Sequence, residues 1–125
     1  MKVAIITDTH YGGKNDNISF AAFQRRFYQD TFFPILRREG ITTIFHLGDC
    51  FDRRKYANYA SLKSAKEMFF DPLKHRGINT HIIVGNHDVV YKNTLEVNSI
   101  DLLLEGYPAF NEYSSPAVIT IDGLD

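Results

Sequence analysis

Three short apolar runs, each followed at once by a polar cluster, constrain the fold of this chain more than any other feature. The runs are residues 3–6, 41–47 and 81–84. The clusters that follow them are Asp8-Thr9-His10, Gly48-Asp49-Cys50-Phe51-Asp52 and Gly85-Asn86-His87-Asp88. Short, continuous apolar runs are typical of strands that are buried on both faces, as in parallel sheets. The pattern therefore predicts three buried strands that each end in a polar loop.

The segments between these runs favour helices. In the first expected helix, four apolar residues recur at helical spacing: Phe20, Phe23, Phe27 and Ile35. We expect the Phe-rich stripe from Phe20 to Phe33 to lie in the core. Ser19 is a suitable N-cap, Pro34 should kink or interrupt the helix, and Gly40 should end it.

A second helix is expected from a cap at Asn58 or Ser61 to Gly77. Its buried stripe consists of four apolar residues: Leu62, Ala65, Phe69 and Leu73. Further along, residues 95–104 favour a short helix, and residues 109–113 and 117–121 favour weaker strands that would pair as a hairpin.

The order strand–helix–strand–helix–strand predicts an α/β fold with parallel strands and right-handed crossovers. All three polar clusters then follow the carboxyl ends of strands, and ligands bind at that edge of open α/β sheets. Clusters about 40 residues apart in the sequence should therefore meet in space.

Length, charge and cysteine content limit the classes of protein. A chain of 125 residues is expected to form one domain, residues 1–125. The formal net charge of −1 argues against a protein that coats nucleic acid. With Cys50 as the single cysteine, no intrachain disulfide can form, which favours a reduced, cytoplasmic setting. The sequence shows no signal peptide or membrane span.

The side chains of the clusters suit hard to borderline divalent metals. Asp8 and His10 supply half of a metal site, and Asp49 follows Gly48, where the backbone can turn sharply towards an ion. Asn86 offers an amide oxygen to a second ion. Two cations about 4 Å apart would clamp a phosphate and activate a bridging water. Mn²⁺, Fe²⁺ or Zn²⁺ fits this donor set better than a structural zinc cage does, and Mg²⁺ is also compatible.

The same clusters supply groups for proton transfer and phosphate binding. If Asn86 binds metal, His87 lies beside the scissile bond and is the candidate general acid. Asp52 could accept a hydrogen bond from His87 and stabilise its charged form. Positive charge at the mouth of the site would come from three consecutive residues: Arg53, Arg54 and Lys55.

Other reactive residues have structural interpretations. His46 lies inside the second expected strand and should be buried and hydrogen-bonded. Cys50 is expected to be a small packed residue rather than a nucleophile.

Taken together, the three clusters resemble the motifs of the calcineurin-like metallophosphoesterase superfamily, and most closely its SbcD-like DNA-repair nucleases. The continuation Arg53-Arg54-Lys55-Tyr56 is similar to phage versions of the recombination endonuclease subunit. The resemblance extends from Met1 to about Asp122. It implies an α/β sandwich of which this chain forms the N-terminal half, with parallel strands and flanking helices.

The resemblance also implies roles for individual residues. Asp8 and His10 would bind the first metal, Asp49 would bridge both metals, and Asn86 would bind the second. His87 would be the catalytic histidine, partnered by Asp52 or nearby groups. Two further positions follow from the same motifs: Asp88 near the ligands, and Arg53, which matches a phosphate-contacting arginine of the protein-phosphatase branch.

The chain departs from the family in one respect. The family has a further metal-binding histidine and a Gly-His-x-His element after Asn-His-Asp, but no histidine follows His87 here. We therefore expect a truncated phosphoesterase domain that, by itself, binds a second metal weakly and turns over little substrate.

Three functions remain open at this point. The leading one is a Mn²⁺-dependent DNA endo/exonuclease subunit that works in recombination and repair with an SbcC-like coiled-coil ATPase; a homodimer is also compatible. The second is a phosphomonoesterase or protein phosphatase of the same superfamily, which Arg53 favours. The third is a naturally short protein that binds one metal or a partner and catalyses nothing, which the missing histidines favour.

Overall fold

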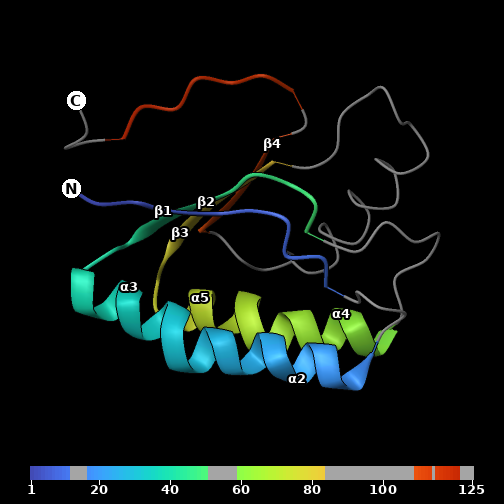
Figure 1. Cartoon of the computed structure of the whole chain (residues 1–125). Coiled ribbons are helices and arrows are strands. Elements are labelled where there is room, and N and C mark those ends of the chain that lie inside the picture. The colour runs from blue at the N-terminus through green and yellow to red at the C-terminus, as the bar shows by residue number, and fades with distance from the viewer. Residues whose placement is uncertain (12–16, 51–58, 84–108, 114, 122–125) are drawn as a thin grey trace.

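The sheet is parallel throughout. The computed structural model describes residues 1–11, 17–50, 59–83, 109–113 and 115–121. Four strands pair in the order β1-β2-β3-β4 (Figure 1). Their bounds are Ala4–Ile6, Thr43–His46, Asn79–Ile83 and Phe110–Tyr113. All three pairings are parallel, which confirms the predicted α/β fold.

The strand register places the ends of the first three strands at one edge. Ile6 pairs with His46, and His46 pairs with Ile82. The chain beyond each of these residues therefore leaves the sheet at the same rim, where the polar clusters were expected to converge. Of the third cluster, residues 85–88 lie outside the described residues.

The expected hairpin is wrong. Residues 110–113 do form a strand, but β4 runs parallel to β3 and adds to the edge of the same sheet. Residues 117–121 have no strand assigned. A parallel pair needs a long crossover, and the chain between Ile83 and Phe110 is long enough to supply one. The helix expected over 95–104 lies outside the described residues.

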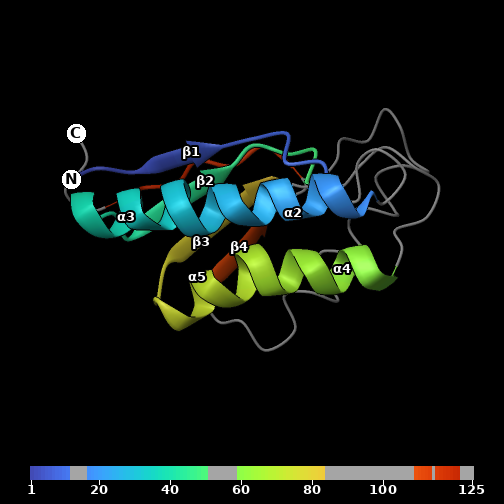
Figure 2. The same ribbon diagram turned by 60° about the horizontal axis from the view of Figure 1, so that its bottom comes forward.

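The helices cover one face of the sheet (Figures 1 and 2). One long helical stretch consists of α2 (Ile18–Phe27), η1 (Tyr28–Phe32) and α3 (Phe33–Glu39). The other consists of α4 (Tyr59–Ala65), η2 (Lys66–Phe70) and α5 (Asp71–His75). In this part of the chain, no helix is long and apolar enough to cross a membrane.

The first helix begins and ends as its sequence allows, with one correction. Asn17, not Ser19, is the N-cap: its side-chain oxygen accepts the Phe20 backbone N–H at 3.0 Å. Gly40 ends α3 at a φ of 65°, a left-handed conformation that glycine adopts without steric cost.

Each helical stretch contains a π-helical turn just before a proline. Pro34 and Pro72 lie in the first turns of α3 and α5, where a missing N–H costs little. The expected interruption at Pro34 therefore takes the form of the π turn η1. In η1 the backbone N–H of Phe33 donates to Tyr28, five residues earlier. The sequence analysis did not anticipate the second π turn, η2.

The predicted core of the first helix is partly wrong. Phe23, Phe27 and Ile35 were expected to be buried, but they are 63%, 43% and 38% exposed. Phe33 is buried as predicted, and Tyr28, which was not predicted, is buried with it, at 4% and 2% exposure. Their spacing of five residues matches the π turn rather than the α-helical spacing on which the stripe was drawn. The stripe of the second helix is correct: Ala65, Phe69 and Leu73 are fully buried, with Leu62 packed against them.

The core lies between the helices and one face of the sheet. Ile44, Phe69, Phe70 and Ile82 are fully buried there. The prediction that residues 3–6 are buried on both faces is wrong for the described structure. Ile5 is 65% exposed, whereas its neighbours Ala4 and Ile6 pack against the core. The described helices cover only one face of the sheet (Figure 1).

Candidate metal centre

Three metal-binding side chains from two loops converge at the carboxyl edge of the sheet. Asp8 and His10 follow β1, and Asp49 follows β2. One possible ligand atom from each residue lies within 4.8 Å of the others. Asp8 is exposed, whereas His10 and Asp49 are half-buried, so the group opens towards solvent on one side. The predicted convergence of the first two clusters is thus observed.

The backbone is strained at each of these three residues. Asp8, His10 and Asp49 have φ angles of 54°, 47° and 50°, and among the described residues no other non-glycine residue has a positive φ. This left-handed conformation costs an L-residue about 1–2 kcal/mol. Such strain persists only where the surrounding structure over-determines the backbone, and it often occurs at functional sites.

Backbone hydrogen bonds join the two loops beyond the ends of their strands. Asp8, His10 and Tyr11 donate their N–H groups to Gly48, Asp49 and Cys50 at 3.1, 3.1 and 2.9 Å. Gly48 itself has a φ of 109°, which confirms the sharp turn expected there. The ladder fixes the two loops to each other, so the donors cannot separate without breaking it.

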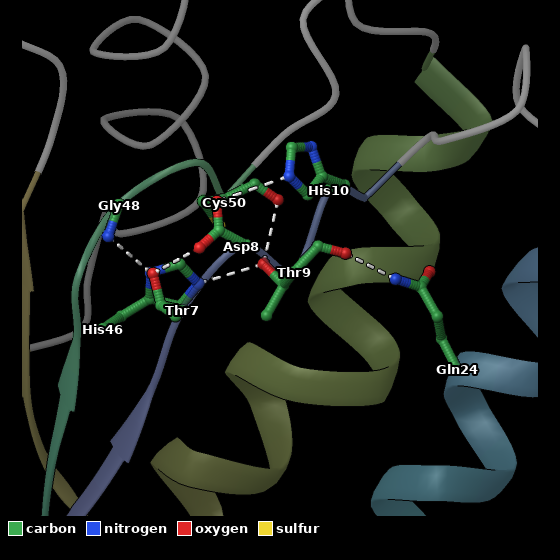
Figure 3. A network of polar contacts seen from close by, with 8 residues as sticks. All are labelled: Thr7, Asp8, Thr9, His10, Gln24, His46, Gly48 and Cys50. Carbon is green, nitrogen blue, oxygen red and sulfur yellow. Dashed lines mark hydrogen bonds and ion pairs between the residues drawn. The ribbon is translucent and has the colours of Figure 1, made fainter.

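His46 lies beneath the two loops and binds both (Figure 3). Its Nδ1 atom accepts the backbone N–H of Gly48 at 3.1 Å. Its Nε2 atom lies 2.9 Å from Thr9 Oγ1, and that hydroxyl donates to the Cys50 carbonyl oxygen at 3.0 Å. His46 is fully buried, as predicted. Removal from solvent lowers its pKa to about 4, although the nearby Asp8 and Asp49 carboxylates oppose that shift.

Three more contacts orient the first loop. Thr7 Oγ1 donates to Asp8 Oδ2 at 2.9 Å, and His10 Nε2 lies 3.5 Å from the other carboxylate oxygen, Oδ1 (Figure 3). From α2, the Gln24 amide donates to the Thr9 carbonyl oxygen at 2.6 Å. The helix layer therefore also contributes to the position of the loop.

A buried pair of tyrosines connects the same loop to the core. The Tyr11 hydroxyl donates to the Tyr28 hydroxyl at 2.7 Å, and the Tyr11 ring packs against Phe69 and Phe70. Burial raises the pKa of both phenols. They are therefore neutral and serve as hydrogen-bonding anchors rather than as bases.

Several predicted site residues lie outside the described residues, and their predicted roles stay predictions: Asp52, Arg53, Arg54, Asn86, His87 and Asp88. Cys50 is confirmed as a fully buried residue.

The sequence analysis missed Thr9, Gln24 and Tyr11 as supports of the site. For Thr9 the sequence offered one signal: this hydroxyl residue lies between two predicted metal ligands, Asp8 and His10. No pattern pointed to the others, because their roles depend on how helix α2 and the η1 turn pack.

The three donors suit a divalent cation. Two carboxylates and an imidazole supply hard oxygen and borderline nitrogen ligands, which bind Mn²⁺, Fe²⁺ or Zn²⁺. Because the ligand atoms already lie close together on a rigid backbone, a cation could be bound with little rearrangement. The residues present therefore fit a metal ion.

Comparison with known proteins agrees with this geometry. The model of the family "Calcineurin-like phosphoesterase" matches residues 1–124. The chain belongs to this family. It is 34% identical over 123 residues to "Exonuclease subunit 1" of Enterobacteria phage T4, a match that covers 98% of this chain and 36% of the relative. It is 33% identical over 92 residues to "DNA double-strand break repair protein Mre11" of Sulfurisphaera tokodaii, covering 71% of this chain and 22% of the relative.

The chain thus spans about a third or less of the curated relatives that it matches. The printed names are those of an exonuclease subunit and a DNA double-strand break repair protein, and with the family match they confirm the resemblance stated from the motifs. The sheet with helices on one face is the corresponding part of a metallophosphoesterase domain.

Proposed function

We propose that the protein is a metal-dependent phosphodiesterase that acts on DNA, as an endo/exonuclease subunit in recombination and repair. The observation that carries this proposal is the convergence of Asp8, His10 and Asp49 on strained backbone at the ligand-binding edge of the sheet. The printed names of the two relatives, an exonuclease subunit and a DNA double-strand break repair protein, support DNA as the substrate.

Four residues would hold two divalent cations. Asp8 and His10 would bind the first, Asp49 would bind both, and Asn86 would bind the second. When bound, such cations neutralise phosphate charge and make a bound water acidic enough to attack at neutral pH. We propose Mn²⁺ for both positions. The spacing and chemistry of the first three donors support this set.

The remaining residues would bind the substrate and move a proton. His87 donates a proton to the leaving oxygen of the phosphodiester, and Asp52 accepts a hydrogen bond from the charged imidazole. Arg53 and Arg54 contact the phosphate, and Asp88 orients the ligands next to it. These roles rest on the sequence motifs.

We further propose that the complete protein works with an SbcC-like coiled-coil ATPase subunit in the cytoplasm, or in the host cytoplasm if a phage encodes it. The word "subunit" in the name of the phage T4 relative supports a partner. A homodimer is the alternative assembly, and the exposed Phe23 and Phe27 on α2 are apolar residues that an interface would cover.

The test is a comparison of two substrates. The protein from the complete reading frame, loaded with Mn²⁺, should shorten linear duplex DNA and should leave DNA intact when a chelator replaces the metal. If DNA stays intact while a phosphomonoester such as p-nitrophenyl phosphate is hydrolysed, the protein is a phosphatase. The Asp49→Ala variant is the negative control for both reactions.

Replacing the proposed acid tests the mechanism separately. In the complete protein, His87→Ala should leave Mn²⁺ binding unchanged and slow DNA cleavage by about 10²–10⁴-fold. His75→Ala is the matched control, because His75 is exposed at the end of α5 on a different element. An unchanged rate in His87→Ala would contradict the role of His87.

A non-catalytic metal-binding or partner-binding protein is the second candidate, because the group of Asp8, His10 and Asp49 could hold one cation without catalysing a reaction. The reading frame beyond Asp125 discriminates between the two. A downstream Gly-His-x-His element would support the nuclease, whereas a stop codon at that point, together with a folded, monodisperse protein that leaves DNA intact, would support the second candidate.

A further inference from the structure

In the two metal loops, residues that carry metal donors alternate with residues that hydrogen-bond to the His46 network. Asp8, His10 and Asp49 carry the metal donors. The residues between and beside them make the hydrogen bonds to the His46 network: Thr9 lies between the first two donors, and Gly48 and Cys50 flank the third. Each metal donor is therefore next in sequence to a residue that the His46 network holds in place.

The protons of this network can be assigned without choice. A backbone N–H can only donate, so the Gly48 N–H requires a lone pair on His46 Nδ1. The imidazole is then neutral and carries its proton on Nε2, which donates to Thr9 Oγ1. The hydroxyl in turn donates to the Cys50 carbonyl oxygen. The chain of hydrogen bonds starts at Gly48 and returns to Cys50 through the other loop.

His46 is not itself a metal ligand in this arrangement. Both ring nitrogens are engaged with protein atoms, and the side chain has no solvent exposure. Its ring also packs edge-on against Phe69, at 6.2 Å between centroids, which fixes the ring plane. The imidazole is therefore held rigidly by the core and transmits that rigidity to both loops.

We propose that His46 is a positioning residue for the metal centre. As the neutral, Nε2-protonated imidazole, it ties the backbone on both sides of Asp49 to Thr9, and so presets Asp8, His10 and Asp49 in their left-handed conformations before a cation binds. This inference rests on the proposed metal-dependent function, since it gives the network its purpose. In this arrangement the Thr9 hydroxyl links the two loops, through His46 and the Cys50 carbonyl oxygen.

The geometry explains why an imidazole suits this place. Its two nitrogens accept from one loop and donate to the other, with a rigid ring between them. An apolar side chain would leave the Gly48 N–H and the Thr9 hydroxyl without these partners. The strained backbone at the donors would then lose this connection between the two loops, and the donors would be less well ordered before the cation binds.

Mn²⁺ titration of the full chain, followed by calorimetry and by the electron paramagnetic resonance spectrum of the bound ion, tests this proposal without any substrate. Thr9→Val removes the hydroxyl with little change in volume and should weaken Mn²⁺ binding by about 10–100-fold, as loss of an outer partner does. Thr9→Ser keeps the hydroxyl and should restore near wild-type affinity. Thr80→Val is the matched control, because Thr80 is also buried but its hydroxyl donates to the carbonyl of Ile78, away from the metal loops.

Variants of His46 test the two halves of the link. His46→Asn keeps an acceptor near Gly48, and His46→Gln keeps a donor near Thr9, so each should bind Mn²⁺ more tightly than His46→Leu. The double variant His46→Leu/Thr9→Val should lose no more affinity than the weaker-binding single variant, because both act through one chain of hydrogen bonds. If His46→Leu fails to fold, the Thr9 series decides the question.

The outcomes separate this inference from the proposed function. Wild-type Mn²⁺ affinity in both Thr9→Val and the folded His46 variants would overturn the positioning role, even if the complete protein degrades DNA. Weakened binding in Thr9→Val but not in Thr9→Ser or Thr80→Val would support it, even if DNA is left intact. Absence of Mn²⁺ binding in the wild-type chain would overturn it as well.

Discussion

The rim of the sheet and the layer between sheet and helices are held together by different forces. At the rim, short polar residues on strained backbone are fixed by hydrogen bonds, and the donors face solvent. Below it, Phe69, Phe70 and Leu73 are fully buried and pack against the sheet. The strained backbone at the rim lowers local stability but fixes the positions of the charged donors. Burial of the apolar layer offsets this cost.

Tyr11 and His46 connect the two regions. The Tyr11 backbone belongs to the ladder between the loops, whereas its ring lies among the core aromatics. His46 hydrogen-bonds to the loops and packs against Phe69. A change in the rim should therefore affect metal binding first, and a change deep in the core should affect stability first.

The largest expected effect is the loss of the metal site. Asp49→Ala removes a carboxylate from the set of three donors and should reduce Mn²⁺ affinity by more than the about 10–100-fold expected for an outer partner. The free energy of unfolding without metal should change little, because the carboxylate is half-buried at the edge of the site. Calorimetric titration measures the first quantity and urea denaturation the second. Glu67→Ala, an exposed acid on η2, is the control, and retained Mn²⁺ stoichiometry in Asp49→Ala would contradict the assignment.

A substitution in the core should lower stability and leave metal binding unchanged. Leu73→Ala removes a fully buried side chain at the far end of the helix layer and should lower the free energy of unfolding by about 2–5 kcal/mol. The folded fraction should keep its Mn²⁺ affinity. Phe23→Ala, at a position that is 63% exposed, should change stability by only about 0.5 kcal/mol. Equal losses in the two variants would mean that the apolar layer is not where stability resides.

Acid should destabilise the metal-free protein through His46. Burial lowers the pKa of His46 from 6.5 to about 4 in the folded chain, so between these values only the unfolded chain binds the proton. Stability is therefore greatest above pH 6.5 and decreases by about 3 kcal/mol as the pH falls to about 4. Burial also lowers the pKa of His81, which adds an effect of the same sign.

Urea denaturation from pH 7 to pH 4 checks this dependence. His46→Gln has no titrating ring at position 46 and should show a shallower loss of stability with falling pH than the wild type. The part due to His81 should remain. Identical pH profiles for the two proteins would show that His46 titrates in the folded chain as it does in water.

The smallest expected effect concerns the link between the regions. Tyr28→Phe removes the hydroxyl that accepts from Tyr11 and leaves that buried phenol without this partner, at a cost of about 1 kcal/mol. Replacing both tyrosines by phenylalanine should recover part of the loss, because the hydroxyl that donated to Tyr28 is then absent as well. Thermal denaturation of the two variants gives the comparison. A double variant less stable than the single one would indicate that Tyr11 has another partner of greater weight.

The parts of the site that follow from chain order could be predicted from the sequence. Parallel strands bring their carboxyl ends to one edge, so Asp8, His10 and Asp49 could be expected to meet before any coordinates existed. The burial of His46 followed from its place inside a strand. These predictions needed only the order of the elements and the alternation of residues along a strand.

The errors arose where the decisive interaction is tertiary. The π turn that begins at Tyr28 depends on how the two helical stretches pack, and Tyr28 is buried there while Phe23 and Phe27 are exposed. The parallel pairing of β4 depends on a crossover of which residues 84–108 lie outside the described residues. The role of Thr9 depends on a partner 37 residues away.

The most direct test of the central claim is a crystal structure of the full chain grown with Mn²⁺, with anomalous scattering used to locate the ion. We predict a strong anomalous peak at bonding distance from the carboxylates of Asp8 and Asp49 and from the His10 imidazole, with the His46 network intact beneath it. A Mn²⁺ ion bound elsewhere, with the two loops separated and these donors apart, would contradict the account.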